Sequence, residues 1–180
     1  RMETKRLVLR PFVIEDAGAM FRNWANDPQV TKFLSWEPHK DVEETKKILE
    51  GWIASYESKD FYTWAIAWRE DEGNVIGSIS VPQLNQKAGR VTVGYCLGRK
   101  WWGNGIMKEA FAELIRFFFE VEGANRVEAL HDTRNVNSGK VMAACGLKKE
   151  GTLRRYGWNN QGICDECIYG MVASDYFEGK

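Results

Sequence analysis

The chain has 180 residues, 44% of them apolar and 28% charged, a mixture that fits one soluble globular domain with a sizeable core. Its 25 basic residues equal its 25 acidic ones, which argues against a general nucleic-acid binder because such binding needs clustered positive charge. No run reaches the roughly 20 apolar residues of a membrane span, and the first residues lack the apolar core of a signal peptide, so we expect a cytoplasmic protein with no nucleic-acid or membrane partner.

The N-terminal half predicts a strand, two helices and then a group of strands. Residues 5–11 alternate between apolar and polar side chains, as a strand does, and residues 15–27 form a helical pattern closed by Pro28. A second helix is expected to begin at Asp41, with Glu44 in a capping-box arrangement. Three strand-like runs separated by turn-forming residues follow at 62–68, 74–81 and 90–97. This order is typical of an antiparallel meander.

The C-terminal half alternates helices and strands. Residues 108–123 carry their apolar side chains on one helical face and end at Gly123, a residue that suits a helix stop. The remaining predicted elements are a strand at 125–132, a short helix at 138–145 and a closing strand pair at 147–158 and 166–173. We therefore expect residues 1–180 to form a single α/β domain, with a mixed sheet flanked by about four helices.

The cysteines do not form the pattern of a metal site. Among Cys96, Cys145, Cys164 and Cys167, only the last two make a C-x-x-C pair. A structural zinc site needs four ligands, and no second ligand pair lies nearby in the sequence. We therefore expect no metal and two reduced thiols near the final strand.

The stretch WWGNGIMKEA, residues 101–110, places Gly103 and Gly105 where a strand gives way to a helix. The first N–H groups of a helix have no partner within it and attract anions, and glycine lets phosphate oxygens approach the backbone. Asn104 can add a donor. The stretch is not the dinucleotide fingerprint, because Lys108 stands at the third glycine position, and it is not a P-loop. It predicts a pyrophosphate cradle, with a glycine-assisted turn as the alternative.

Here the sequence resembles the GNAT superfamily of acyl-CoA-dependent N-acetyltransferases, whose pyrophosphate motif Q/R-x-x-G-x-G/A maps onto Trp102 to Met107. Three more segments match, in order, the branch containing the RimJ and RimL types of ribosomal-protein N-terminal acetyltransferase. They are METKRLVLRPF near the start, NVNSGKVMAACGL at 135–147, and EGTLRR with the closing Y-G-M strand. Two positions depart from the motif: Trp102 replaces Gln or Arg, and Met107 replaces Gly or Ala.

The resemblance implies a GNAT-like fold and acetyl transfer from acetyl-CoA to a primary amine. In that family the pantetheine arm lies between two parallel strands that splay apart, which correspond here to residues 91–97 and 127–132. A strand N–H would polarise the thioester carbonyl. The cofactor-binding residues implied are Cys96, Leu97, Trp102, Gly103, Asn104, Gly105, Ile106, Met107 and Asn135, with the cradle resting mainly on Gly103, Asn104 and Gly105.

Two residues are candidates for the chemistry. Ser138 occupies the serine position of the N-x-x-S segment and would protonate the departing sulfur, although a helix cap is its alternative role. His131 is a candidate base, and a neutral packed histidine is the alternative. Asp165 and Glu166, near the closing hairpin, can be considered for the same role, and a solvated face explains them equally well. Other branches of the superfamily use a tyrosine acid four residues after the serine position, where this chain has Met142.

The acceptor is expected to meet the link between the first two helices, at residues 35–40 and the start of the second helix, with a contribution from residues 157–166. Trp36 would pack against it, while Glu37 and Asp41 would attract a cationic amine; a solvated Glu37 and a helix-capping Asp41 are the alternatives. An α-amine is about one-tenth neutral at pH 7 and a lysine under about one-thousandth, so the lack of a clear base favours a protein N-terminus. A small-amine acetyltransferase and a silent acyl-CoA-binding module are the competing functions, in a monomer or a homodimer.

Overall fold

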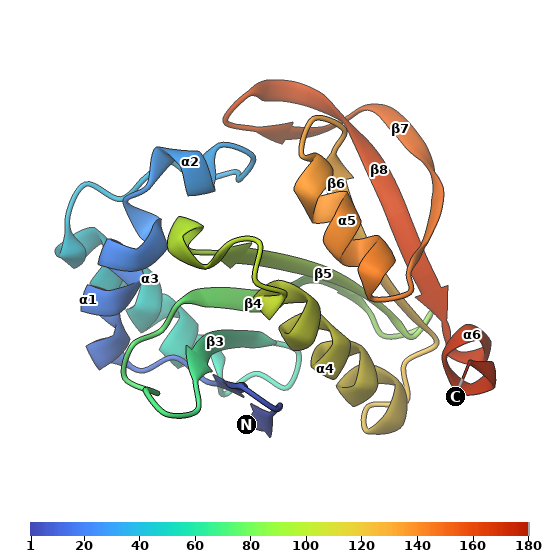
Figure 1. The fold of residues 1–180 in the computed structure, drawn as a ribbon, viewed down its shortest axis with the longest axis horizontal. Coiled ribbons are helices and arrows are strands. Elements are labelled where there is room, and N and C mark those ends of the chain that lie inside the picture. Colours follow the sequence, from blue (N-terminus) through green and yellow to red (C-terminus); the bar gives the residue numbers. More distant parts are fainter. Residues whose placement is uncertain (180) are drawn as a thin grey trace.

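We analysed a computed structural model that describes residues 1–179; Lys180, the last residue of the predicted domain, lies outside the described residues. Eight strands form one sheet in the order β1-β2-β3-β4-β5-β6-β8-β7 (Figure 1). The strands are β1 (Met2–Glu3), β2 (Leu7–Arg10), β3 (Thr63–Trp68), β4 (Gly77–Asn85), β5 (Arg90–Leu97), β6 (Arg126–Asp132), β7 (Lys148–Asn159) and β8 (Gly162–Val172). Strands β1 to β5 are antiparallel and β5 pairs with β6 in parallel, which confirms the predicted mixed sheet.

Six α-helices accompany the sheet in the described part of the chain, against about four in the prediction. They are α1 (Ala17–Met20), α2 (Pro28–Thr31), α3 (Val42–Ser55), α4 (Ile106–Glu120), α5 (Val136–Ala144) and α6 (Ala173–Glu178). The predicted helix at 15–27 is irregular: it begins as a 3₁₀ turn and ends as a π turn in which the Asn26 N–H donates to the Phe21 carbonyl. The two additional helices, α2 and α6, are too short to show a helical period in the sequence.

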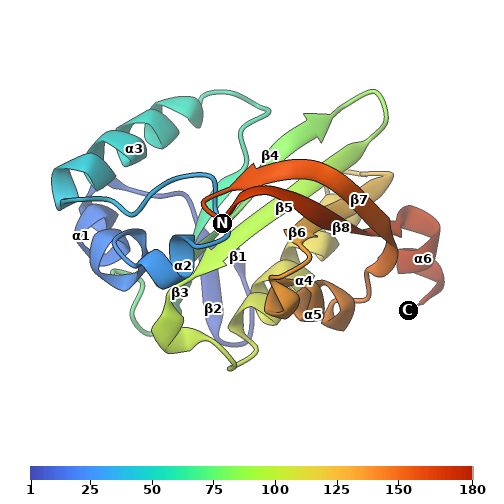
Figure 2. The ribbon, with the colours of Figure 1, turned by 90° about the horizontal axis from the view of Figure 1, so that it is seen from above.

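Helices cover both faces of the sheet (Figure 2). Helix α4 packs on one face through Phe111, Leu114, Ile115 and Phe118, all at most 3% exposed, as the apolar face predicted. Helices α1 and α3 pack on the other face around Trp24, which is fully buried. Burial of both faces fixes the central strands firmly, so the site described below rests on a rigid scaffold.

Strands β5 and β6 pair only over part of their length. The parallel ladder joins Arg90 to Arg126 and ends where Val93 meets Ala129, although both strands continue. Beyond that point the strands separate, as the resemblance implied. The neighbouring strand β4 has a register shift between Ser80 and Gln83, and such bulges bend a strand locally.

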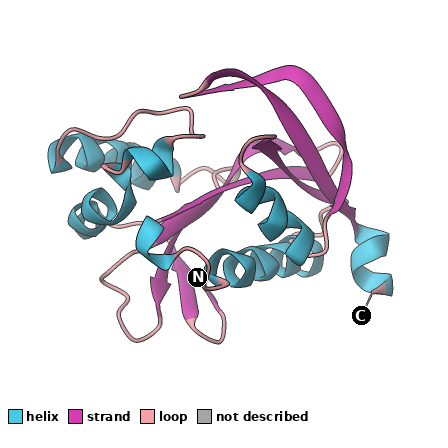
Figure 3. Cartoon of the chain, turned by 45° about the horizontal axis from the view of Figure 1, so that its top comes forward, coloured by secondary structure: helices cyan, strands magenta, loops and turns pink. Residues whose placement is uncertain are grey.

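The long β7–β8 hairpin curves over the top of the molecule and reaches towards the loop after α2 (Figure 1 and Figure 3). Between the pairs Leu153–Glu166 and Gly157–Cys164, β7 contains two more residues than β8. This bulge holds Arg155, a non-glycine residue with φ of 51°. At the hairpin turn the Asn160 side-chain amide donates to the Thr31 and Trp36 carbonyls, both at 2.8 Å, so the hairpin is tied to the loop.

Among residues 1–179, no helix is long and apolar enough to cross a membrane. The same residues contain no group of three or more metal-ligating side chains. The four cysteines are free thiols; Cys164 contacts the Asn159 amide and Cys167 contacts the Thr152 hydroxyl, so the two thiols of the C-x-x-C pair have different neighbours.

Candidate active site

A cavity of about 260 Å³ begins where β5 and β6 separate. Its walls come from β5, β6, α5, the hairpin and the loop after α2; the lining includes Phe33, Tyr95, Asn135, Ser138, Trp158 and Glu166. A second hollow of about 490 Å³, lined by Lys5, Arg6, Trp68, Arg69 and Glu70, contains none of the predicted site residues. The first cavity is therefore the candidate active site.

Ser138 lies inside α5, two residues after its first residue, so it does not cap the helix. Asn135 is the N-cap residue instead, and its side chain makes no capping hydrogen bond. The Ser138 hydroxyl lies 3.1 Å from the Tyr95 hydroxyl, which also donates to the Ser138 carbonyl. Burial raises the pKa of Tyr95, so its hydroxyl stays protonated at neutral pH. The two side chains bring a pair of hydroxyls into the cavity wall.

The two glycines before α4 have left-handed backbones, with φ of 76° at Gly103 and 70° at Gly105. A side chain at either position would therefore be strained. Gly105 is the N-cap residue of α4 and brings no side chain to the free N–H groups of the first turn. A Cβ at Gly103 would meet no atom within 4 Å, so the space above the loop is open. Free N–H groups facing open space are what an anion requires.

Side chains around this loop hold its shape. The Asn104 amide donates to the carbonyls of Trp102 at 3.0 Å and Trp101 at 3.4 Å, so it stabilises the turn rather than projecting a donor outwards. Arg6 donates to the Asn104 carbonyl and forms an ion pair with Glu109 in the first turn of α4. The Trp102 indole N–H donates to the Leu97 carbonyl at 2.7 Å. The loop is thus connected to β2 and to the end of β5.

The motif residue Met107 does not obstruct the loop. Its side chain is 6% exposed and packs into the core, as does that of Ile106. Cys96 is also directed away from the cavity, because its thiol contacts the Ser78 hydroxyl on β4 at 3.2 Å. Ile106, Met107 and Cys96 can therefore contact a cofactor only through their backbone groups. For Cys96, a backbone contact is the role that the resemblance implied.

The His131 imidazole is packed beneath α5. Its Nδ1 lies 2.7 Å from the Asp132 carbonyl, and because a carbonyl only accepts, Nδ1 carries the hydrogen. Its Nε2 is buried without a hydrogen-bond partner among the described residues. A Cβ at Gly139 would clash with this ring atom. The ring therefore lies against the helix backbone, the environment of the packed histidine that the sequence left as an alternative.

Asp132 and Glu166 are the carboxylates of the cavity wall. The Arg134 guanidinium, together with the Asn159 amide, holds the pKa of Asp132 well below its usual range. Burial and the charge of Asp132 raise the pKa of Glu166 above its usual value. Opposite shifts in neighbouring acids are characteristic of sites that move protons.

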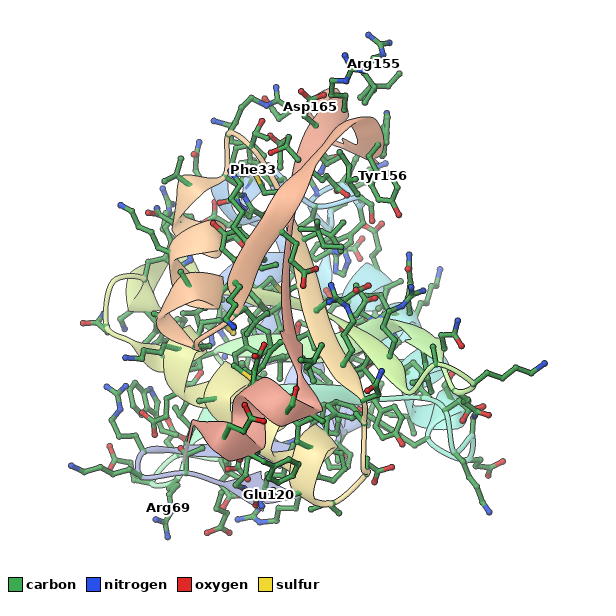
Figure 4. The ribbon with its side chains drawn as sticks, turned by 90° about the vertical axis from the view of Figure 1, so that its right-hand side faces the viewer. Phe33, Arg69, Glu120, Arg155, Tyr156 and Asp165 are labelled. Atoms are coloured by element: carbon green, nitrogen blue, oxygen red, sulfur yellow. The ribbon has the colours of Figure 1, made fainter. Side chains whose placement is uncertain are left out.

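The predicted acceptor residues Trp36, Glu37 and Asp41 are not among the residues that line the cavity, whose loop residues are Phe33, Leu34 and Ser35. Asp41 caps α3, with its carboxylate accepting from the Glu44 N–H at 2.9 Å. Glu37 is exposed. Trp36 packs against the His39 ring. Figure 4 shows Phe33 in the same part of the molecule as the bent hairpin, where Arg155 points outwards.

Comparison with known proteins identifies this architecture. A family model described as "Acetyltransferase (GNAT) domain" matches residues 6–148. The chain is a GNAT acetyltransferase. It is 32% identical over 171 residues to the "Uncharacterized N-acetyltransferase YoaA" of Bacillus subtilis, covering 95% of this chain and 96% of the relative. It is 27% identical over 187 residues to the "[Ribosomal protein uS5]-alanine N-acetyltransferase" of Escherichia coli, covering 100% and 94%.

A solved structure of RimL, a ribosomal L7/L12 α-N-protein acetyltransferase in complex with coenzyme A, has a TM-score of 0.84 at 19% identity. The overlap covers 96% of this GNAT acetyltransferase and 97% of RimL. This likeness shows a shared fold, and the family match, together with relatives named as N-acetyltransferases, makes the chain an acetyl-CoA-dependent N-acetyltransferase. The uncapped first turn of α4, the open space above Gly103 and the unpaired ends of β5 and β6 all suit an extended cofactor that carries phosphates.

Sequence analysis missed Tyr95 and did not separate a chemical role for Glu166 from a solvated one. Tyr95 shares one strand face with the buried residues Val91 and Val93. Its position on a central strand therefore suggested only a core residue. Glu166 stands beside Asp165 near the hairpin, where a solvated pair explains two adjacent acids. Two acids directly opposite each other in adjacent strands, as Asp132 and Glu166 are, would have indicated a functional site. The sequence did not predict the pairing of β6 with β8 residue by residue.

Proposed function

We propose that this chain acetylates the N-terminal α-amine of a protein or peptide. The observation that carries the proposal is the charge of the acceptor end of the cavity. Asp132 is neutralised by Arg134, so Glu166 is left as the one lining carboxylate without a cationic partner among residues 1–179. One free negative charge matches the single charge of an α-ammonium better than the several charges of a polyamine.

The names of relatives support the same acceptor class. One relative is named for an alanine of a ribosomal protein and a structural neighbour is named as an α-N-protein acetyltransferase. The aromatic rings of Phe33 and Trp158 in the cavity wall would pack on the first side chain of a peptide. Such an acceptor is found in the cytoplasm, the compartment that the sequence favours.

The cofactor would bind mainly to backbone groups. We assign its pyrophosphate to the N–H groups between Gly103 and Met107, with Asn104 holding the loop in shape. Its pantetheine arm would lie along Cys96 and Leu97, and Asn135 at the cavity wall would contact it. This places the thioester carbon, which the cofactor supplies as the electrophile, near the separation of β5 and β6.

Within this arrangement Ser138 is the proton donor. Its hydroxyl would protonate the sulfur as the carbon–sulfur bond breaks, while the Tyr95 hydroxyl, 3.1 Å away, orients it. We retain His131 as an alternative base, although its environment is that of a packed ring. Glu37 and Asp41 would act on the acceptor only through their fields, and Trp36 through packing of the loop.

An acceptor panel tests the proposal. Thiol release and mass spectrometry would compare a peptide with a free α-amine, the same peptide with a blocked α-amine and one lysine, and spermidine, all at matched concentration. We expect the highest kcat/KM for the free α-amine and at least a tenfold loss when it is blocked. A preference for spermidine would instead establish a small-amine enzyme.

A further inference from the structure

Glu166 and Asp132 are direct partners in the antiparallel ladder of β8 and β6, yet their environments differ completely. Asp132 accepts hydrogen bonds from the backbone and guanidinium of Arg134 and from the Asn159 amide. Among residues 1–179 no side chain or backbone N–H donates to the Glu166 carboxylate, although it is partly buried. Asp132 is therefore occupied by the protein, whereas Glu166 is available to a ligand in the cavity.

The backbone of β7 makes room for this carboxylate. The bulge in β7 brings Gly157 beside Glu166, and a Cβ at Gly157 would overlap the Glu166 carboxylate. The carboxylate thus occupies the space that a side chain of β7 would fill. Gly157 is not one of the glycines with a positive φ. A glycine at this position therefore matters because it lacks a side chain, and not because of its backbone conformation.

We propose that Glu166 is the general base that deprotonates the acceptor amine, a role that rests on the proposed acetylation of an α-amine. An acceptor enters the cavity as an ammonium, and one of its protons passes to the Glu166 carboxylate, directly or through a water. The nitrogen lone pair then forms the bond to the acetyl carbon. As the carbon–sulfur bond breaks, the Ser138 hydroxyl gives its proton to the sulfur and takes the second nitrogen proton in its place. The products are the amide, coenzyme A and one proton released when Glu166 is regenerated.

Charges around Glu166 suit this role. From β6 it faces Asp132, whose charge is balanced by Arg134, and on β8 the nearest titratable group on the same face is the thiol of Cys164. Strand β7 presents Leu153 and Gly157, and the loop Phe33–Ser35 has no titratable side chain. Burial and the charge of Asp132 raise the pKa of Glu166, which makes its carboxylate a stronger base than an ordinary glutamate.

The test measures kcat/KM of Glu166→Gln against pH from 6 to 9 with the peptide acceptor. The carboxylate accepts a proton and the amide does not, so we expect a loss of about 10²–10⁴-fold at pH 7. Without a base only the neutral amine reacts, and its fraction grows about tenfold per pH unit below its pKa. The deficit of Glu166→Gln should therefore shrink about tenfold per pH unit between pH 6 and 8. A merely structural role would give a deficit that does not change with pH.

A second variant moves the carboxylate without removing it. Gly157→Ala should displace the flexible end of Glu166 and lower kcat, whereas Gly151→Ala on the same strand, where a Cβ meets no atom within 4 Å, should not. In the Glu166→Gln background, Gly157→Ala should cost no further activity, because its effect acts through Glu166. Unchanged acetyl-CoA affinity and thermal unfolding midpoint would show that each variant remains folded.

His131→Asn is the control for the alternative base, because an asparagine amide can still donate to the Asp132 carbonyl while Nε2 is lost. We expect no pH-dependent deficit from it. If that variant shows the shrinking deficit, or Glu166→Gln shows a constant deficit or none, Glu166 is not the base. Wild-type enzyme that prefers spermidine would overturn the proposed acceptor alone, and the same pH series would then be run with spermidine.

Discussion

The cofactor side and the acceptor side of the cavity are built in different ways. The cofactor side is one continuous stretch from β5 through the glycine loop into α4, and it offers backbone groups whose positions depend on left-handed glycines. The acceptor side joins segments far apart in the sequence: the Asn160 amide bonds to carbonyls 129 and 124 residues earlier. Its chemistry lies in side chains from β6, β8 and the loop after α2.

This difference explains how one scaffold can keep a cofactor while its acceptor changes. A site made of backbone tolerates most side-chain substitutions, as Met107 illustrates by placing its side chain in the core. A site made of side chains changes its specificity with each of them. The predictions below probe the two sides separately, beginning at the point where they meet.

Ser138 lies between the two sides, and its substitution should have the largest effect. Ser138→Ala should lower kcat about 10²–10⁴-fold, because the leaving sulfur loses its proton donor. Acetyl-CoA affinity, measured by calorimetry, should stay within about twofold, since the hydroxyl acts as the bond breaks. Tyr95→Phe removes the hydroxyl that orients Ser138 and should cost up to about tenfold. Ser174→Ala, an exposed serine in α6, is the matched control. Equal turnover of Ser138→Ala and wild type would remove Ser138 from the mechanism.

On the cofactor side, Gly105→Val should weaken acetyl-CoA binding at least tenfold while the acceptor KM at saturating cofactor changes little. Gly105 has φ of 70°, a conformation that costs a residue with a Cβ about 1–2 kcal/mol, and its Cβ would lie 3.8 Å from the Arg6 guanidinium that holds the loop. Gly73→Ala, at an open position without positive φ, serves as the control. Calorimetry that finds unchanged affinity in folded Gly105→Val would argue against the cradle.

The same difference accounts for what the sequence could predict. Strand β5 matches the predicted range 90–97, and α4 begins two residues before the predicted 108, because local patterns specify both. The glycine loop could be recognised for the same reason. The neighbours of Glu166 could not be predicted, because the two additional residues in the β7 bulge determine which residue of β7 lies beside Glu166. No local sequence pattern reveals the register of β7 against β8.

Two further residues show the same contrast between local and long-range contacts. Asp41 was predicted both as a helix start and as an acceptor contact, and its side chain caps α3 as the local pattern indicates. The partnership of Tyr95 with Ser138 crosses 43 positions of sequence and depends on α5 packing beside β5. Long-range contacts between side chains therefore decide the chemistry, and only the fold reveals them.

On the acceptor side, Asn160→Ala should loosen the loop from the hairpin, leaving the bond from the residue-160 backbone N–H to the Leu34 carbonyl. Losing two hydrogen bonds to backbone carbonyls should lower the free energy of unfolding by about 1–3 kcal/mol, measured by denaturant titration. The acceptor KM should rise severalfold because the wall formed by Phe33 and Leu34 loosens, while acetyl-CoA affinity stays unchanged. Gln161→Ala, exposed at the same turn, is the control. An effect on acetyl-CoA affinity alone would contradict the division into two sides.

Glu37→Gln should have the smallest effect. The carboxylate is exposed and follows the lining residue Ser35 by two positions, so it acts on an ammonium only through a field that salt screens over about 8–10 Å. The acceptor KM should rise about two- to fivefold at low ionic strength, and the difference from wild type should vanish near 0.5 M salt, with kcat and acetyl-CoA affinity unchanged. Glu70→Gln, an exposed acid outside the cavity lining, gives the baseline for loss of one surface charge. A difference that persists at high salt would mean that Glu37 contacts the acceptor directly, and the acceptor side would then extend outwards from Phe33 along the loop towards α3.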